Sequence, residues 1–166
     1  MMRYALLTLA LVVPLTAASA QAKKRGATRT QRPVTIALPD QMTWGPAPAV
    51  LPVGAKLAVL EGDPTKAGAF TMRLLMPDGY QISPHFHPAT EHVTVVSGAL
   101  MVGMGEKFDE SQMKALPAGT FGMIPAGMHH YAKAKGETVL QLHGMGPWRL
   151  IYVNRADDPR RRGAAK

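Results

Sequence analysis

The residues best suited to do chemistry lie in one short stretch of the sequence. Residues 79–98, GYQISPHFHPATEHVTVVSG, hold three of the chain's six histidines and a glutamate. Side chains two positions apart in an extended strand share a face, so His85 and His87 point the same way and Phe86 points the other way. Glu91 follows a turn-forming PAT and can return from the start of the next strand as an oxygen ligand. Such a group suits a divalent transition metal, although a lone His-x-His pair in a strand is more often structural.

Two longer patterns contain these residues. The first reads G-x5-H-x-H-x3-E-x6-G and is filled by Gly79, His85, His87, Glu91 and Gly98. The second reads G-x5-P-x-G-x2-H and is filled by Gly119, Pro125, Gly127 and His130. Together they resemble the two signature motifs of the cupin superfamily, and the resemblance covers residues 51–154. The one departure is Ala134, which stands where the family has an asparagine that is not a metal ligand.

The resemblance implies a fold and a set of metal ligands. The fold is an all-β, double-stranded β-helix (jelly-roll) cupin barrel, here with an N-terminal proline-rich arm. One divalent metal per chain would be held by His85, His87, Glu91 and His130. This donor set suits Fe, Mn, Co or Ni in six-coordinate geometry with two positions open, whereas Zn prefers four ligands and is the weaker expectation. If the strand pairing slipped by one residue, His129 would replace His130, but the family spacing favours His130.

Two further polar residues are candidates for contacts around the metal. In TVLQLHG, strand alternation places Gln141 and His143 on one face and Leu140 and Leu142 on the other. If the leucines pack between sheets or against a partner, Gln141 and His143 face the cavity and contact the metal ligands or the substrate. The alternative is a hydrogen-bonded histidine at a strand end. His92 is expected to face away from the metal.

The elements that must position these residues are short strands. Runs such as KLAVLEG, AFTMRLLMP and WRLIYV are separated by Gly, Pro and Asp, as in a β-sandwich or barrel. Gly98 stands between the apolar runs EHVTVVSG and ALMVGMG, where we expect it to reverse a hairpin. The only helix expected is a turn or two within EKFDESQMKAL.

The first residues have the form of a secretory signal. Arg3, an apolar run and then small residues predict a signal peptide over residues 1–20, cleaved after Ala20 or Ala22. The run is too short to span a bilayer, and the alternatives are an uncleaved anchor or a buried first strand. We therefore expect an extracytoplasmic protein, periplasmic or secreted. The rest of the chain is expected to divide into a basic, proline-rich leader and arm at 21–50, the cupin barrel at 51–154 and a basic tail at 155–166.

The charge and composition exclude several classes of protein. The net charge of +8 arises at the two ends, from Lys23, Lys24, Arg25, Arg29, Arg32, Arg160, Arg161, Arg162 and Lys166. The sequence between them is nearly balanced and has no basic face beside an aromatic ladder, so we expect neither nucleic-acid binding nor stable membrane insertion. The sequence has no cysteine, which excludes a thiol enzyme, an iron–sulfur protein or a thiolate zinc site.

These residues favour a metal-dependent enzyme that acts on a small molecule. Cupins with similar ligands catalyse several kinds of reaction, and among these we expect oxygenase-type chemistry first. A small anionic or enediol-type substrate, or dioxygen, would occupy the open metal positions, and Glu91 would complete the ligand set and act as a base. The alternative is a non-catalytic cupin module that binds or senses a metal or small ligand. As a partner we expect a second copy, with residues 34–52, including Trp44, as an arm across a homodimer.

Overall fold

The structure, a computed structural model, describes residues 34–162. Within this range the strands are β1 (Gly45–Pro46), β2 (Lys56–Glu61), β3 (Gly68–Met76), β4 (Gln81–Phe86), β5 (Glu91–Met104), β6 (Lys114–Pro117), β7 (Phe121–Ile124), β8 (His130–Gly146) and β9 (Ile151–Tyr152). The helical elements are η1 (Pro39–Gln41), η2 (Glu110–Gln112), η3 (Arg155–Asp157) and α1 (Pro159–Arg162), and η2 is the short helical turn expected from the sequence. No helix in the described range has the length and apolar character needed to cross a membrane. The predicted signal peptide and residues 21–33 of the leader lie outside the described residues.

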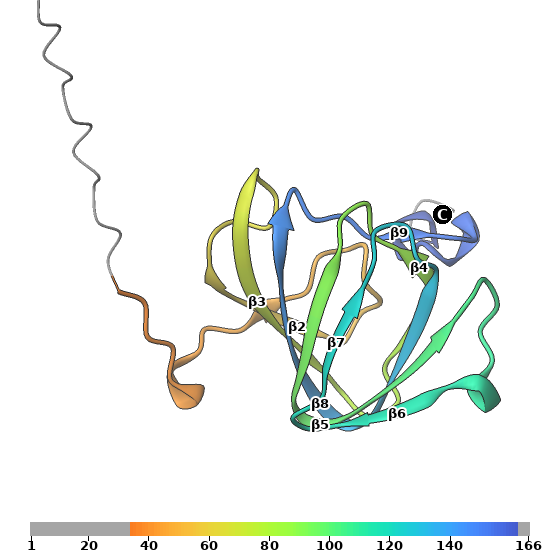
Figure 1. The fold of residues 1–166 in the computed structure, drawn as a ribbon, viewed down its shortest axis with the longest axis horizontal. Helices are drawn as coiled ribbons and strands as arrows, with labels where there is room; N and C mark the ends of the chain where they lie inside the picture. Colours follow the sequence, from red (N-terminus) through yellow and green to blue (C-terminus); the bar gives the residue numbers. More distant parts are fainter. Residues whose placement is uncertain (1–33, 163–166) are drawn as a thin grey trace, which may run out of the picture. The chain divides into compact units, whose positions relative to one another are not determined.

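Two long strands organise the sheet. β5 and β8 pair antiparallel along nearly their whole length. Residues 138–146 of β8 pair with β3, whereas residues 130–133 pair with β4. In the same way, residues 91–94 of β5 pair with β7 and residues 99–102 pair with β6. The strands therefore form two layers, β1-β2-β3-β8-β5-β7 and β9-β4-β8-β5-β6, which share β5 and β8 (Figure 1).

The apolar side chains of both layers pack into one core. In β3 every second residue is buried, among them Phe70, Met72 and Leu74, as the alternation of an antiparallel strand requires. Leu100 of β5 and Ile82 of β4, which belong to the other layer, are in the same cluster. A shared interior between two curled layers is the jelly-roll arrangement, so the expected all-β cupin barrel is confirmed.

Gly98 does not reverse the chain, and the predicted hairpin is wrong. It lies inside β5 with a φ of 72°, at a shift of register against β8. Ser97 pairs with Val139 whereas Ala99 pairs with Lys135, so β8 carries extra residues at this point and the strand pair bends without ending. The two apolar runs that were expected to form a hairpin are consecutive parts of one strand.

A buried threonine replaces ladder hydrogen bonds at this bend. Thr138 is completely buried, and its Oγ1 accepts a hydrogen bond from the Ala99 N–H at 3.3 Å. The same hydroxyl lies 3.0 Å from the Ala99 carbonyl oxygen and 3.0 Å from that of Gly136, and it can donate its proton to either. The hydroxyl thus pairs the Ala99 N–H and one of the two carbonyl oxygens where the register is interrupted.

The segment before β2 is tied to the barrel of its own chain. β1 pairs with β2, and Ala47, Val50 and Leu51 pack against the core. The Tyr80 hydroxyl donates to the Pro52 carbonyl oxygen at 2.6 Å, and the Tyr152 hydroxyl donates to that of Val50 at 2.9 Å. The predicted domain boundaries and the homodimer arm stay predictions.

We expect Gly98→Ala to destabilise the barrel more than Gly79→Ala does. The two glycines have nearly the same φ, 72° and 71°, so each alanine has about the same left-handed backbone cost, about 1 kcal/mol. A Cβ at Gly98 would overlap the Glu137 carbonyl oxygen and lie 2.9 Å from Thr138 Cα, whereas a Cβ at Gly79 meets nothing within 4 Å. Urea unfolding should show about 2 kcal/mol of additional loss for Gly98→Ala. Equal losses in the two variants would contradict the close packing of the bend.

Candidate metal centre

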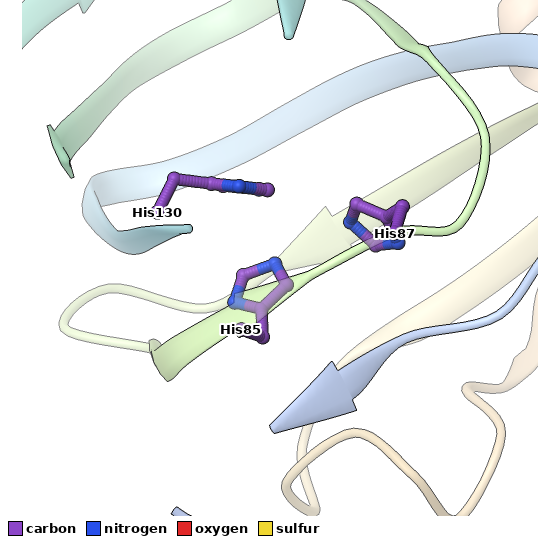
Figure 2. Close-up of side chains that lie close together, drawn as sticks. All are labelled: His85, His87 and His130. Atoms are coloured by element: carbon purple, nitrogen blue, oxygen red, sulfur yellow. The ribbon is translucent and has the colours of Figure 1, made fainter. Parts of the chain in front are cut away.

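Three histidine side chains converge on the inner wall of the barrel. His85 of β4 is the register partner of His130, the first residue of β8, and their ring centroids are 4.2 Å apart. His87 follows immediately after the end of β4. One ring nitrogen from each of the three lies within 4.8 Å of the others, and Figure 2 shows the rings gathered around a common point. We call His85, His87 and His130 the histidine triad.

The backbone sets the orientation of each imidazole in the triad. Each ring places its Nδ1 against a carbonyl oxygen, at 2.8 Å from Ser83 for His85, 2.8 Å from Arg149 for His87 and 3.0 Å from Met128 for His130. A carbonyl oxygen can only accept a hydrogen bond, so each Nδ1 carries the proton. The Nε2 atom of each neutral ring therefore keeps its lone pair, which is the form that binds a metal.

Burial keeps two of these rings neutral. The triad side chains are between 3% and 5% exposed. Burial lowers the pKa of His85 well below 6.5, and the neighbouring His130 and His87 lower it further. Burial also lowers the pKa of His87, although the Glu91 carboxylate opposes that effect. Neutral imidazoles at physiological pH need not lose a proton before a metal binds.

Glu91, the first residue of β5, brings a carboxylate to the triad. Its Oε2 lies 3.2 Å from His130 Nε2 and 3.7 Å from His87 Nε2. A carboxylate oxygen and an unprotonated Nε2 are both acceptors, so at these distances they repel each other unless a proton or metal cation lies between them. The donors thus fit a divalent cation held by the triad and Glu91, the set that the resemblance to cupins implies.

An aromatic ring that the sequence analysis did not single out supports the triad. Trp148 stacks on His87, with centroids 4.2 Å apart and 18° between the planes. Its backbone N–H donates to the Pro64 carbonyl oxygen at 2.6 Å, and its ring also packs against Phe70. No local sequence pattern indicates this role, because the residues that meet here are far apart in the chain.

Gln141 and His143 do not face the cavity, which corrects the expectation for these two residues. Leu140 and Leu142 are buried and line the cavity, so strand alternation turns their neighbours to the outer face. There the Arg73 Nε–H donates to Gln141 Oε1 at 3.2 Å. The prediction that Gln141 and His143 face the cavity depended on the leucines packing elsewhere, and in the structure Leu140 and Leu142 themselves line the cavity.

The other two histidines also lie on the outer face. His129 Nδ1 is 3.1 Å from Glu106 Oε1, and the ring packs against Phe86. His92 stacks on His143 with centroids 5.0 Å apart and 13° between the planes. The structure thus brings His130 and not His129 to the triad, and it places His92 away from it.

The triad opens onto a cavity of about 520 Å³, a volume typical of small-molecule sites. Its walls include the triad, Glu91 and apolar side chains from both layers, among them Met72, Leu74, Val93, Leu100, Leu140 and Leu142. The site therefore combines buried metal-type donors with room for a small molecule beside them.

Several solved structures have a similar fold. A proposed acetylacetone dioxygenase from Methylibium petroleiphilum PM1 is 19% identical, with a TM-score of 0.60 over 80% of this chain and 90% of that one. The polyketide cyclase RemF from Streptomyces resistomycificus is 13% identical, with a TM-score of 0.59 over 79% and 93%. An RmlC-like cupin from Shewanella frigidimarina NCIMB 400 is 16% identical, with a TM-score of 0.51 over 66% and 87%. At these identities the similarity shows the fold alone.

The two-layered barrel and these similarities show a cupin-type fold. Within that class, the chain belongs to the family described as "Domain of unknown function (DUF4437)", which residues 35–162 match. No curated protein matches the sequence.

We expect the metal-free protein to lose stability as the pH falls below about 6.5. The pKa values of His85 and His87 are lower in the folded chain than the ordinary 6.5, so below that pH the unfolded chain binds more protons. This contribution to stability is complete above the ordinary pKa and is lost as the pH falls toward the folded one. Thermal unfolding in the presence of a chelator, between about pH 8 and pH 5, measures it.

Two variants isolate the contribution of the triad from that of other titrating groups. His85→Gln should flatten the pH dependence, whereas His129→Gln, at a side chain that is 32% exposed, should leave it close to that of the unmodified protein. The same slope in all three proteins would contradict the assignment of a neutral, buried His85.

Proposed function

We propose that this protein is an extracytoplasmic, metal-dependent cupin enzyme that acts on a small molecule by oxygenase-type chemistry. The observation that carries the proposal is the convergence of three imidazoles, each with its Nδ1 on a backbone carbonyl oxygen, beside the Glu91 carboxylate on a cavity wall. Fe, Mn, Co and Ni suit these donors best, and Zn remains the weaker candidate.

A bound metal would supply Lewis acidity and, for a redox-active ion, one-electron chemistry. The chain's own residues provide the surroundings for that chemistry. The Nδ1 hydrogen bonds orient the rings, and the small exposure of the triad limits the access of bulk water. Glu91 has its carboxylate at the cavity wall, where it can accept a proton from a bound substrate.

The similar structures support this proposal only in a general way. One is described as a proposed acetylacetone dioxygenase and another as a polyketide cyclase, so barrels of this architecture are associated with chemistry on small molecules. The proposed extracytoplasmic location is supported by the signal-like residues 1–20.

We expect the iron-loaded protein to consume oxygen when an oxidisable small molecule is present. An oxygen electrode would follow the protein, reconstituted with Fe²⁺, against a panel that includes acetylacetone and other small enolisable ketones. Glu91→Gln should lower the rate by about 100-fold or more, because it removes a positioned base, which contributes about that much, and weakens a ligand of the metal. Glu106→Gln, at an exposed glutamate that faces His129, is the matched control and should keep the rate.

If the metal-loaded protein binds members of the panel but neither consumes oxygen nor converts them in any other way, the proposal that it is an enzyme is contradicted. That result would favour the alternative, a non-catalytic cupin that binds or senses a small ligand.

A further inference from the structure

We propose that the cavity takes an apolar small molecule whose polar atoms are gathered at one end, and that it discriminates against sugars and other polyhydroxylated molecules. This inference rests on the proposed function, because it names the class of substrate for the same site. It comes from the composition of the cavity wall.

The buried part of the wall offers no polar side chain beyond the metal-type donors and the Trp148 indole. Among the described residues that line the cavity, the remaining polar side chains are Thr65, Arg149 and Arg160, and all three are exposed. The lining side chains that are buried outside the triad and Glu91 are apolar, such as Met72 and Leu100 at 5% and 3% exposed. A ligand therefore meets polar partners at the triad and the opening, and apolar ones elsewhere.

The polar groups of a ligand can all be satisfied at one end of it. Arg149 is exposed and lines the cavity, and its carbonyl oxygen accepts a hydrogen bond from His87 Nδ1, so this exposed part of the wall lies beside the triad. Arg160 Nη2 donates a hydrogen bond to Asp158 Oδ2 at 2.6 Å, so its guanidinium is less able to bind an anion. An oxygen-bearing group can thus bind at the triad while the rest of the molecule contacts apolar side chains.

A polyhydroxylated molecule of similar size cannot place all of its polar groups at the triad. Its hydroxyl groups are spread over the whole ring, so several of them would be buried against apolar side chains without a hydrogen-bond partner. Each such group loses its hydrogen bonds to water without replacement, whereas an apolar chain in the same place is stabilised by its removal from water.

Two carboxylates test the discrimination, because they carry the same charge and differ in the polarity of the body. Isothermal titration of the manganese-loaded protein with octanoate and with D-glucuronate compares them, and a parallel titration uses the metal-free protein. We expect octanoate to bind at least tenfold more tightly than glucuronate. Octanoate that binds no more tightly than glucuronate, or that does not bind, would overturn the inference.

A matched pair of substitutions locates the octanoate in the cavity. Val102→Phe fills part of the cavity, whose wall includes Val102. Val59→Phe introduces the same side chain at a residue of β2 that is 48% exposed and does not line the cavity. Octanoate affinity should fall at least tenfold in Val102→Phe and stay within a factor of two in Val59→Phe. Equal affinities in the two variants would overturn the inference, and if Val102→Phe fails to fold, the comparison of the two carboxylates decides.

The titrations separate this inference from the proposed function. If the protein binds no manganese but its metal-free form still prefers octanoate, with the loss in Val102→Phe, the apolar class stands and the metal-dependent function falls. If manganese binds and glucuronate is preferred, the metal site stands and the apolar class is overturned.

Discussion

The bend in the β5 and β8 pair brings the two ends of the site together. A straight strand with the 14 residues of β5 would be about 45 Å long. In register, His130 pairs with Met104 at one end of β5, yet its Nε2 lies 3.2 Å from the Glu91 carboxylate at the other end. Only a strand pair that curls back on itself can bring these two ends together. Gly98 supplies the positive φ at this bend, and the buried Thr138 hydroxyl pairs the Ala99 N–H there.

The triad is buried in the curled barrel. Burial of an imidazole destabilises the fold unless both of its ring nitrogens have a partner. Three polar rings lie on the wall of a largely apolar cavity, where an unpaired nitrogen would be destabilising. The Nδ1 of every ring donates a hydrogen bond to a backbone carbonyl oxygen, and Trp148 stacks against His87. The Nε2 atoms lie close to one another and to the Glu91 carboxylate. Lone pairs in this arrangement repel one another, whereas a cation between them attracts them all. The Nδ1 hydrogen bonds therefore both stabilise the buried rings and leave each Nε2 free to bind a metal.

Sequence reasoning succeeded where the answer depended on local geometry. Alternation along each strand was enough to predict that His85 and His87 share a face and that His92 faces away from the site. The preference for His130 over His129 came from the resemblance to the second cupin motif. It failed where distant segments decide. A glycine with positive φ suits a hairpin or an irregular strand pair equally well, and only the pairing of both apolar runs with β8 shows that Gly98 lies at a shift of register within one strand. The direction in which Gln141 faces likewise depends on what Leu140 and Leu142 pack against, which a single strand does not reveal.

Elemental analysis shows whether the triad and Glu91 hold a divalent metal. The protein should be purified without chelator and without nickel affinity resin, beside a His85→Ala, His87→Ala double variant. We expect about one iron, manganese, cobalt or nickel ion per chain, lost in the variant while circular dichroism still reports β-structure. No metal in the unmodified protein, or the same metal content in a folded variant, would contradict it.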